Sequence, residues 1–307
     1  MTQELQVVRA SEIEGPPGGG VPWLLESLWG DGAVGVIGGA PKCCKSWMAL
    51  EMAVAVASGR PCLGRFAVEN PGPVLVFAAE DAPVQVRQRL ENLAQARSAN
   101  WEQLEVRLIV ESSLRLDRPT DLGRLRATLD RHRPRLLVLD PYVRLQRADE
   151  NNATEVAAIL GALRDLSRTF ALAIVLVHHA RKGGDLGEGL RGSSDFHAWG
   201  DSNLYLRRRR EGIVLSVEHR AAASPEPLLL SLVADAGPVR LEIQGQPVEL
   251  SLADRLLQIL EDGEPRRLED LRQALRARKQ DVSKALRELE AAAHVVRSDA
   301  GYRRPQS

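Results

Sequence analysis

Four short aliphatic runs, separated by stretches with helical periodicity, constrain the fold of this 307-residue sequence more than any other feature. Runs of this length suit fully buried strands, and the segments between them are long enough to cross back over a sheet. Strands that alternate with helices predict βαβ units and a mainly parallel sheet, that is, an α/β fold. The runs cover residues 33–37, 73–79, 135–139 and 171–177.

Composition divides the chain into three parts. Residues 1–32 are rich in glycine and proline at positions 15–20 and apolar from Val21 to Leu25, which predicts a loose arm and a short segment packed on the core. Residues 33–246 form the α/β domain, in which the stretch from about 203 to 246 predicts hairpins that extend the sheet antiparallel. Pro247 marks a linker, and residues 251–307 form a second domain.

The second domain combines three amphipathic stretches with two short strands around a turn. Helices are predicted over residues 252–260, 268–276 and 280–291, and a hairpin over residues 294–304. Three helices and a hairpin in so short a segment predict a C-terminal winged helix-turn-helix.

The turn after the first aliphatic run, residues 38–47 (GGAPKCCKSW), leads into an apolar helical stretch from Met48 to Ala57. A strand, a glycine-rich turn and Lys-Ser at a helix start form the setting of a phosphate-binding P-loop. The inward-pointing backbone N–H groups and the helix N-terminus attract polyphosphate. Lys45 is expected to reach the outer phosphates, and the Ser46 hydroxyl to hold Mg²⁺. The predicted nucleotide-binding residues here are Gly39, Ala40, Pro41, Lys42, Cys43, Cys44, Lys45, Ser46 and Trp47.

One position of this turn departs from the P-loop pattern G-x-x-x-x-G-K-[ST]. The pattern has glycine before the lysine, and here the residue is Cys44. A side chain at this point crowds the place where the backbone meets phosphate. The turn by itself therefore does not settle the function, and the rest of the chain has to support it.

Polar residues end the later aliphatic runs, and in a parallel sheet these ends meet at one edge, where ligands bind. Asp140 is predicted to position Mg²⁺, or else only to begin a turn before Pro141. Glu80 is predicted to orient and deprotonate the attacking water, or else to favour the dipole of the next helix. His178 or His179 is expected to sense the γ-phosphate. Zinc is disfavoured, because no cysteine or carboxylate lies at ligand spacing from the histidines.

Composition sets the broad class. The net charge is zero, so the sequence as a whole offers no electrostatic case for nucleic acid, and any contact with it must be local. The three cysteines, two of them adjacent, do not form a disulfide framework and suggest a reduced cytoplasm. No apolar run approaches the length of a membrane span, and the N-terminus lacks an export signal, so no membrane contact is expected.

Two further basic segments are candidates for contacts outside the P-loop. The glycine-rich stretch 181–190 is either a mobile loop that meets nucleic acid phosphates or a plain surface loop. Arg207 begins a run of four arginines at a predicted strand end. Its side chain is either solvated or contacts, in trans, the γ-phosphate of the nucleotide bound to a neighbouring subunit.

In the second domain, the stretch 279–304 holds the residues predicted to contact DNA. Gln280, Ser283, Lys284 and Arg287 would face the major groove from the third helix, and the arginines near Tyr302 would form the wing. Residues 251–307 hold 12 basic and 10 acidic side chains, a net charge of only +2, which supports DNA contact weakly. The alternative is a winged helix that contacts a protein.

The stretches GGAPKCCKSWMAL, VLVFAAEDAPVQVRQRL, RLLVLDPYVRL with DENNATEV, IVLVHHARK and LRGSSD occur in an order that resembles the RecA-like ATPases of the RepA hexameric helicase type. The resemblance covers about residues 20 to 210. It implies a RecA-like P-loop NTPase core, ring assembly and hydrolysis of ATP with Mg²⁺. It also implies Lys45 and Ser46 as nucleotide and Mg²⁺ residues, Glu80 as the catalytic glutamate and Asp140 as the Walker B acid.

By the same resemblance, His178 or His179 is the sensor, Arg207 is a candidate arginine finger, and Arg89 matches the arginine in the helix after the glutamate. Two functions follow as hypotheses. The first is a ring-forming, ATP-hydrolysing, helicase-like motor that acts on DNA in replication or on mobile DNA. The second is a nucleotide-gated regulator with slow turnover, whose winged helix binds an operator or a protein.

Overall fold

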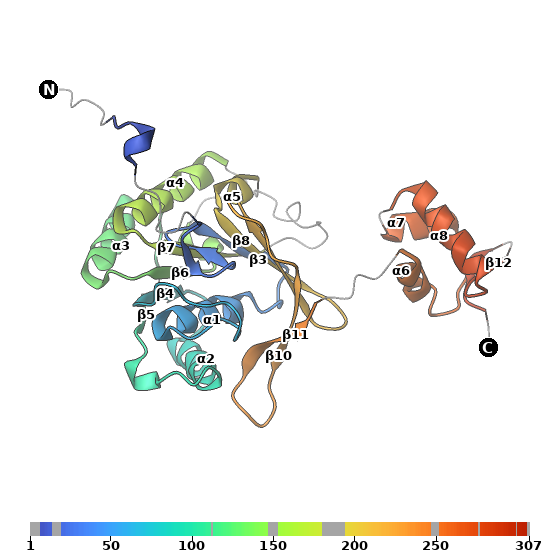
Figure 1. The fold of residues 1–307 in the computed structure, drawn as a ribbon, viewed down its shortest axis with the longest axis horizontal. Coiled ribbons are helices and arrows are strands. Elements are labelled where there is room, and N and C mark those ends of the chain that lie inside the picture. Colours follow the sequence, from blue (N-terminus) through green and yellow to red (C-terminus); the bar gives the residue numbers. More distant parts are fainter. Residues whose placement is uncertain are drawn as a thin grey trace. The chain divides into compact units, whose positions relative to one another are not determined.

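The computed structural model describes residues 7–13, 20–111, 113–146, 153–179, 194–246, 252–275, 277–298 and 300–305. The chain separates into two compact units, residues 1–247 and residues 248–307. Each is described by itself. In the first unit, helices lie on both faces of one large sheet (Figure 1).

The described part of the first unit contains a nine-stranded sheet with the order β11-β10-β9-β8-β3-β7-β6-β4-β5. Its strands are β3 (Val34–Gly39), β4 (Val74–Ala78), β5 (Val106–Leu108), β6 (Leu136–Asp140), β7 (Ala173–His179), β8 (Ser202–Arg208), β9 (Ile213–His219), β10 (Leu228–Val233) and β11 (Arg240–Gly245). A separate hairpin pairs β1 (Trp23–Leu25) with β2 (Trp29–Gly30). The predicted α/β fold with a mainly parallel sheet is confirmed.

The antiparallel extension begins one strand later than the sequence pattern predicts. β9, β10 and β11 are antiparallel as expected, but β8 lies parallel to β3, with Ile37 opposite Leu204 and Gly39 opposite Leu206. A parallel neighbour requires a long crossover connection, and the segment between β7 and β8 supplies it, with α5 (Ser194–Trp199) within it. The parallel part of the sheet therefore includes β8.

Alternating side chains along the central strands supply two cores, one on each face of the sheet. The first packs α1 (Lys45–Ser58), α2 (Pro83–Ala96) and the β1–β2 hairpin against one face. The second packs α3 (Pro119–His132), α4 (Ala153–Phe170), α5 and η3 (Tyr142–Leu145) against the other. Strands buried on both faces explain the unbroken aliphatic runs. The remaining short helices are η1 (Ala10–Glu12) and η2 (Trp101–Gln103).

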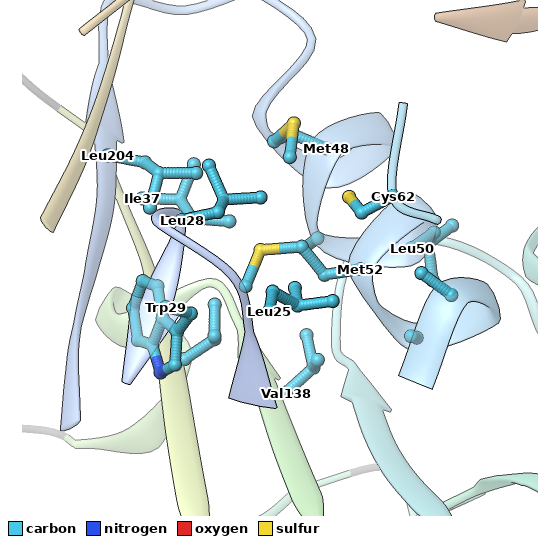
Figure 2. Packing of buried hydrophobic residues seen from close by; sticks show 14 of the residues in the cluster. Leu25, Leu28, Trp29, Ile37, Met48, Leu50, Met52, Cys62, Val138 and Leu204 are labelled. Atoms are coloured by element: carbon cyan, nitrogen blue, oxygen red, sulfur yellow. The ribbon is translucent and has the colours of Figure 1, made fainter. Parts of the chain in front are cut away.

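Helix α1 is buried over most of its length, and this fixes the position of the turn before it. Met52 reaches between Leu25 and Leu28, and Met48 lies on the face of α1 that is turned toward Ile37 (Figure 2). The segment predicted to pack onto the core is thus the β1–β2 hairpin, which covers α1. Since α1 is held between the hairpin and the sheet, its N-terminus has a fixed place.

The second unit contains three helices and a two-stranded hairpin. They are α6 (Leu252–Ile259), α7 (Leu268–Leu275), α8 (Lys279–Ala291), β12 (Val296–Ser298) and β13 (Gly301–Arg303). Arg266, between α6 and α7, forms an antiparallel bridge with Tyr302 of the hairpin. The unit has its own apolar core, centred on Leu256, Leu271 and Leu286. The order of elements is the predicted one, and the winged helix-turn-helix itself stays a prediction.

Among the described helices, none is both long and apolar enough to span a bilayer.

Candidate functional site

The turn between β3 and α1 is shaped by Gly39, the last residue of β3. Its φ of +154° is a backbone conformation that L side chains rarely adopt. A Cβ at this position would lie 2.3 Å from the carbonyl oxygen of Leu206 and 2.7 Å from Sγ of Cys43. Glycine is therefore required for β3 to lie against β8 and still turn into the loop.

Cys44 occupies the point where the P-loop pattern has glycine, and the backbone keeps the conformation that glycine suits. Its φ is 65° and its ψ is 28°, which is left-handed, and it forms the N-cap of α1 without a capping hydrogen bond from its side chain. Lys42, two residues earlier, has a φ of 63°. Both L residues hold a conformation that is uncommon outside glycine and asparagine. The P-loop path is retained despite the substitution.

Lys45 is held inside the turn. Its side chain is buried, and Nζ donates to the carbonyl oxygens of Gly39 at 2.9 Å and Ala40 at 2.8 Å. Burial lowers the pKa of Lys45, and the neighbouring Cys43 and Asp140 oppose that shift. An ammonium held by loop carbonyls at the helix N-terminus is a ready partner for phosphate oxygens.

Asp140 ends β6 beside the P-loop helix, as the sequence predicts. Burial raises the pKa of Asp140 to about 6; the hydrogen bond with Ser46 opposes this, and the charge of Asp81 adds to it. A hydroxyl and a carboxylate in contact are oxygen donors of the kind that Mg²⁺ takes when substrate phosphates complete its shell. Among the described residues, no group of three or more His, Cys, Asp or Glu side chains could hold a metal by itself. The residues present therefore fit a magnesium–nucleotide complex.

Glu80 follows β4, and its carboxylate faces the same pocket. Arg144 donates to it at 3.1 Å, and Nε2 of His179 lies 4.0 Å from it. The Glu80 side chain is 44% exposed, so water has access to the carboxylate. A solvated carboxylate beside the P-loop has the position that a general base for an attacking water needs.

The two histidines at the end of β7 separate onto opposite faces of the sheet. His179 lines the pocket, whereas His178 is only 3% exposed and packs against Tyr142 and Phe196, with ring centroids 6.0 Å and 4.5 Å away. Burial lowers the pKa of His178 to about 4, so its ring is neutral at pH 7. The structure does not bring His178 to the pocket, because neighbouring residues of a strand alternate. Of the two, His179 is the one that lines the pocket, and its sensor role stays a prediction.

Trp47 and Arg89 meet at one side of the pocket. The Arg89 guanidinium lies 5.7 Å from the centroid of the Trp47 ring, within cation–π range. Asp81 fixes this guanidinium through two hydrogen bonds, at 2.6 and 3.1 Å. Both predicted nucleotide contacts are therefore brought together. The sequence predicts Asp81 as a cap of the next helix, but α2 has Ala82 at its N-cap without a side-chain hydrogen bond, and Asp81 pairs with Arg89 instead.

The pocket has a volume of about 430 Å³. Its lining comprises Lys42, Cys43, Cys44, Lys45, Ser46, Trp47, Ala78, Glu80, Asp81, Arg89, Asp140, His179, Arg208 and Leu232. Most of the predicted site residues are thus in one place. Gly39 and Ala40 shape the loop behind it, where their carbonyls bind Lys45.

Arg207 does not line this pocket, whereas Arg208 does. Arg207 is exposed, so its predicted role toward a neighbouring subunit stays a prediction. The alternation of side chains along a strand could have identified Arg208 from the sequence, because Arg208 is two residues beyond the buried Leu206 and lies on the same face. For Leu232, on the β10–β11 hairpin, no local pattern was available, since tertiary pairing alone brings that hairpin to the P-loop.

Cys43 and Cys44 differ in their surroundings. Cys43 is buried, and its Sγ lies 3.9 Å from Nζ of Lys45, whereas Cys44 is half-buried. Burial raises the pKa of both thiols. Both are protonated at pH 7, and neither is an activated nucleophile.

In the second unit, α8 presents the polar face that the sequence predicts. Val282, Leu286 and Leu289 are buried, whereas Gln280, Lys284 and Arg287 are exposed and Ser283 is half-buried. In the hairpin, the exposed Arg297 lies over the Tyr302 ring at 5.7 Å. The loop 181–190, the other predicted DNA contact, lies outside the described residues.

Comparison with known proteins agrees with this geometry. The pattern of the AAA domain family matches residues 2–185. A DnaB-like replicative helicase, solved in a study of its interactions with primase, shares the fold with a TM-score of 0.52 at 13% identity, over 68% of this chain and 57% of the helicase chain. The match thus spans less than two thirds of the helicase. The RadB recombinase matches with a TM-score of 0.49 at 17% identity, over 66% of this chain and 88% of the recombinase.

The family match covers more than half of the chain, and it includes the P-loop, Glu80 and Asp140. The chain belongs to the AAA domain family, and its first unit is a RecA-like P-loop NTPase domain.

Proposed function

We propose that this protein binds and hydrolyses ATP with Mg²⁺ and uses the reaction to act on DNA as a ring-forming, helicase-like motor. One observation carries the proposal. The P-loop, Glu80, Asp140 and His179 stand at the ends of four neighbouring parallel strands and line one pocket. Ligands bind at this edge of α/β sheets.

Each residue has a role in the proposed reaction. Lys45 binds the outer phosphates and offsets the charge that develops on them. Glu80 orients the attacking water and takes its proton, while Arg144 holds its carboxylate by a hydrogen bond. Ser46 and Asp140 would hold Mg²⁺, which would supply positive charge against the phosphates.

Ring assembly and DNA contact complete the proposal. Arg207, exposed at the end of β8, would reach the γ-phosphate site of a neighbouring subunit and act as an arginine finger. DNA contact is assigned to loop 181–190 and to the exposed face of α8 with the hairpin, residues 279–304. A hexamer is the assembly that the RepA-type resemblance implies.

The first test is ATP hydrolysis by the purified protein beside a Lys45→Ala variant, with and without single-stranded DNA. The proposal requires hydrolysis well above the variant and stimulation by DNA. Activity equal to that of Lys45→Ala in both conditions would remove the motor proposal. If ATP is hydrolysed but a forked duplex is never opened, helicase action is wrong and the ATPase stands.

DNA contact through the second unit has its own test. Lys284→Ala/Arg287→Ala should weaken DNA binding and lower its salt dependence, because each phosphate contact releases counterions. Glu288→Ala is the matched control, since it changes the charge of the same helix in the opposite direction. Equal DNA affinity of all three proteins would move the DNA contact away from α8.

A second candidate is a nucleotide-gated regulator with slow turnover, and the observation that favours it is Cys44. A side chain at this left-handed position narrows the approach of phosphate to the backbone. The regulator would assemble on binding ATP, and its second unit would bind an operator or a protein. ATP-dependent assembly together with turnover at the level of Lys45→Ala would favour it over the motor.

A further inference from the structure

The four consecutive arginines at the end of β8 do not share one environment. Leu204 and Leu206 pack in the core on the α1 side of the sheet, and Arg208 continues the same row at two-residue spacing. Arg207, one residue earlier, belongs to the opposite face. Since β8 lies beside β3, the row of Arg208 ends at the P-loop of its own subunit.

Arg208 is already in contact with that loop. Its Nε and Nη2 donate to the carbonyl oxygen of Lys42 at 3.3 and 3.0 Å, and its charge also acts on the Cys44 thiol. Guanidinium carries five N–H donors in a planar fork, so these two contacts leave others available. The side chain is exposed and lines the nucleotide pocket together with Lys42 and Lys45.

Positive charge in this pocket offsets the negative charge that meets there. Three carboxylates, Glu80, Asp81 and Asp140, face it, and a nucleoside triphosphate adds more negative charge. Arginine suits phosphate because its fork matches two oxygens at once and its charge persists at every working pH. Among the described residues that line the pocket, the carboxylate of Asp81 holds Arg89, whereas Arg208 contacts the Lys42 carbonyl and the Cys44 thiol.

We propose that Arg208 is a phosphate-binding residue that acts in cis, on the nucleotide held by the P-loop of its own subunit. This rests on the proposed function, namely that the P-loop binds ATP. It is a different role from the one proposed for Arg207, which is directed at the neighbouring subunit. Alternation along β8 thus assigns Arg207 and Arg208 to different nucleotides.

A purely structural role for Arg208 is the competing explanation. In that case the guanidinium only ties the P-loop to β8 through the Lys42 carbonyl. The two roles separate by substitution. Arg208→Gln keeps an N–H donor for the carbonyl but loses the charge, and Arg208→Lys keeps the charge.

The experiment measures the Kd of ADP and of a non-hydrolysable ATP analogue, each with Mg²⁺, for the wild type and for Arg208→Lys, Arg208→Gln and Arg208→Ala. We expect Arg208→Gln and Arg208→Ala to bind about 10- to 100-fold more weakly, the range for one charged hydrogen bond. Arg208→Lys should recover much of the affinity. Arg209→Ala, with the same loss of charge one residue further along, is the control and should bind like the wild type.

Thermal unfolding without nucleotide checks that each variant is folded. Equal affinity of Arg208→Gln and the wild type would overturn the proposal, as would Arg208→Gln and Arg208→Lys losing affinity to the same extent. A wild type that binds no better than Lys45→Ala would instead show that the proposed function itself is wrong.

A separate experiment tests whether Arg208 acts on the nucleotide of its own subunit. Arg208→Ala and Lys45→Ala subunits are co-expressed with different tags and purified together. If Arg208 acts in cis, every site lacks one of the two cations, so the Kd of the assembly stays that of the single variants. Recovery of a class of sites with wild-type affinity would show that Arg208 acts in trans and would overturn the assignment.

Discussion

Cys44 shows how a single residue can depart from a motif and still leave its geometry in place. The backbone at this position is left-handed, and it begins α1 without a side-chain cap. The core packing of α1 holds the turn in this path. The cysteine therefore costs conformational energy locally, while Lys45 stays bound to the carbonyls of Gly39 and Ala40.

Replacing Cys44 by glycine should relieve that cost. A non-glycine residue in the left-handed region is strained by about 1 kcal/mol, partly offset by the greater freedom of glycine in the unfolded chain. We expect Cys44→Gly to raise the free energy of unfolding by about 0.5 kcal/mol and to retain or raise ATP turnover. Denaturant unfolding and steady-state hydrolysis measure the two effects. A large loss of turnover would mean that the cysteine has a role of its own.

The buried His178 gives the protein a pH dependence with a predictable sign. Its pKa is about 4 in the folded protein and ordinarily 6.5, so the unfolded chain binds the proton more readily. The contribution of His178 to the free energy of unfolding is complete above pH 6.5. It falls as the pH drops from 6.5 to 4, by up to about 3 kcal/mol. Denaturant unfolding at pH 7 and pH 5 measures it.

The control for this pH dependence is His178→Phe, which keeps an aromatic ring against Tyr142 and Phe196 but cannot titrate. The difference between the two proteins cancels the other titrating groups. We expect the variant to lose less stability than the wild type between pH 7 and pH 5. Parallel pH profiles would contradict the assignment of the shift to His178.

At the scale of elements, the close pairing of β3 with β8 positions the P-loop. The Val36 N–H donates to Oδ1 of Asn203 at 3.1 Å, and Gly35 lies directly against the β8 backbone. A Cβ on Gly35 would lie 1.7 Å from the carbonyl oxygen of Ser202. The strand that carries the P-loop can therefore approach its neighbour only with glycine at this point.

Gly35→Ala should separate these strands and destabilise the protein by more than about 2 kcal/mol, because neither backbone can move away without breaking ladder hydrogen bonds. Gly161→Ala is the matched control. That glycine lies on the exposed side of α4, with nothing within 4 Å of the added Cβ, so alanine should stabilise by about 0.5–1 kcal/mol. Denaturant unfolding of both variants and the wild type measures the two effects. The same unfolding midpoint for Gly35→Ala and Gly161→Ala would contradict the close contact between Gly35 and β8.

The elements that the sequence predicted best are the central strands and the helices beside them. Their aliphatic runs are long and unbroken because both faces are buried, so periodicity alone identifies them. The sequence predicted less well how β8 pairs. Its residues look the same whether the neighbour is parallel or antiparallel, and only the crossover that contains α5 decides the direction.

At the scale of the whole molecule, the two units have separate apolar cores. We therefore expect two unfolding transitions, of which only the one from residues 1–247 responds to nucleotide. An ATP analogue at 100-fold its Kd should stabilise that unit by about 2.7 kcal/mol. Calorimetry of the full chain, with Lys45→Ala as the control, measures this. A shift of both transitions would show that the units are energetically coupled.

The sequence by itself determined the α/β class, the P-loop and the polar strand ends at Glu80 and Asp140. These are local features: a buried strand, a turn and a helix start each have a composition that neighbouring residues dictate. The sequence likewise indicated the polar face of α8, because helical periodicity separates Val282 and Leu286 from Lys284 and Arg287.

The tertiary structure decided which side chains share the pocket. His179 rather than His178, and Arg208 rather than Arg207, face the P-loop, because strand alternation assigns each to a face and only sheet order identifies the face beside α1. Leu232 is a longer-range case, since it reaches the pocket through the antiparallel strands beyond β8. The spacing of residues along the chain identifies the candidate site residues. The packing of distant segments then decides which of these candidates line the pocket.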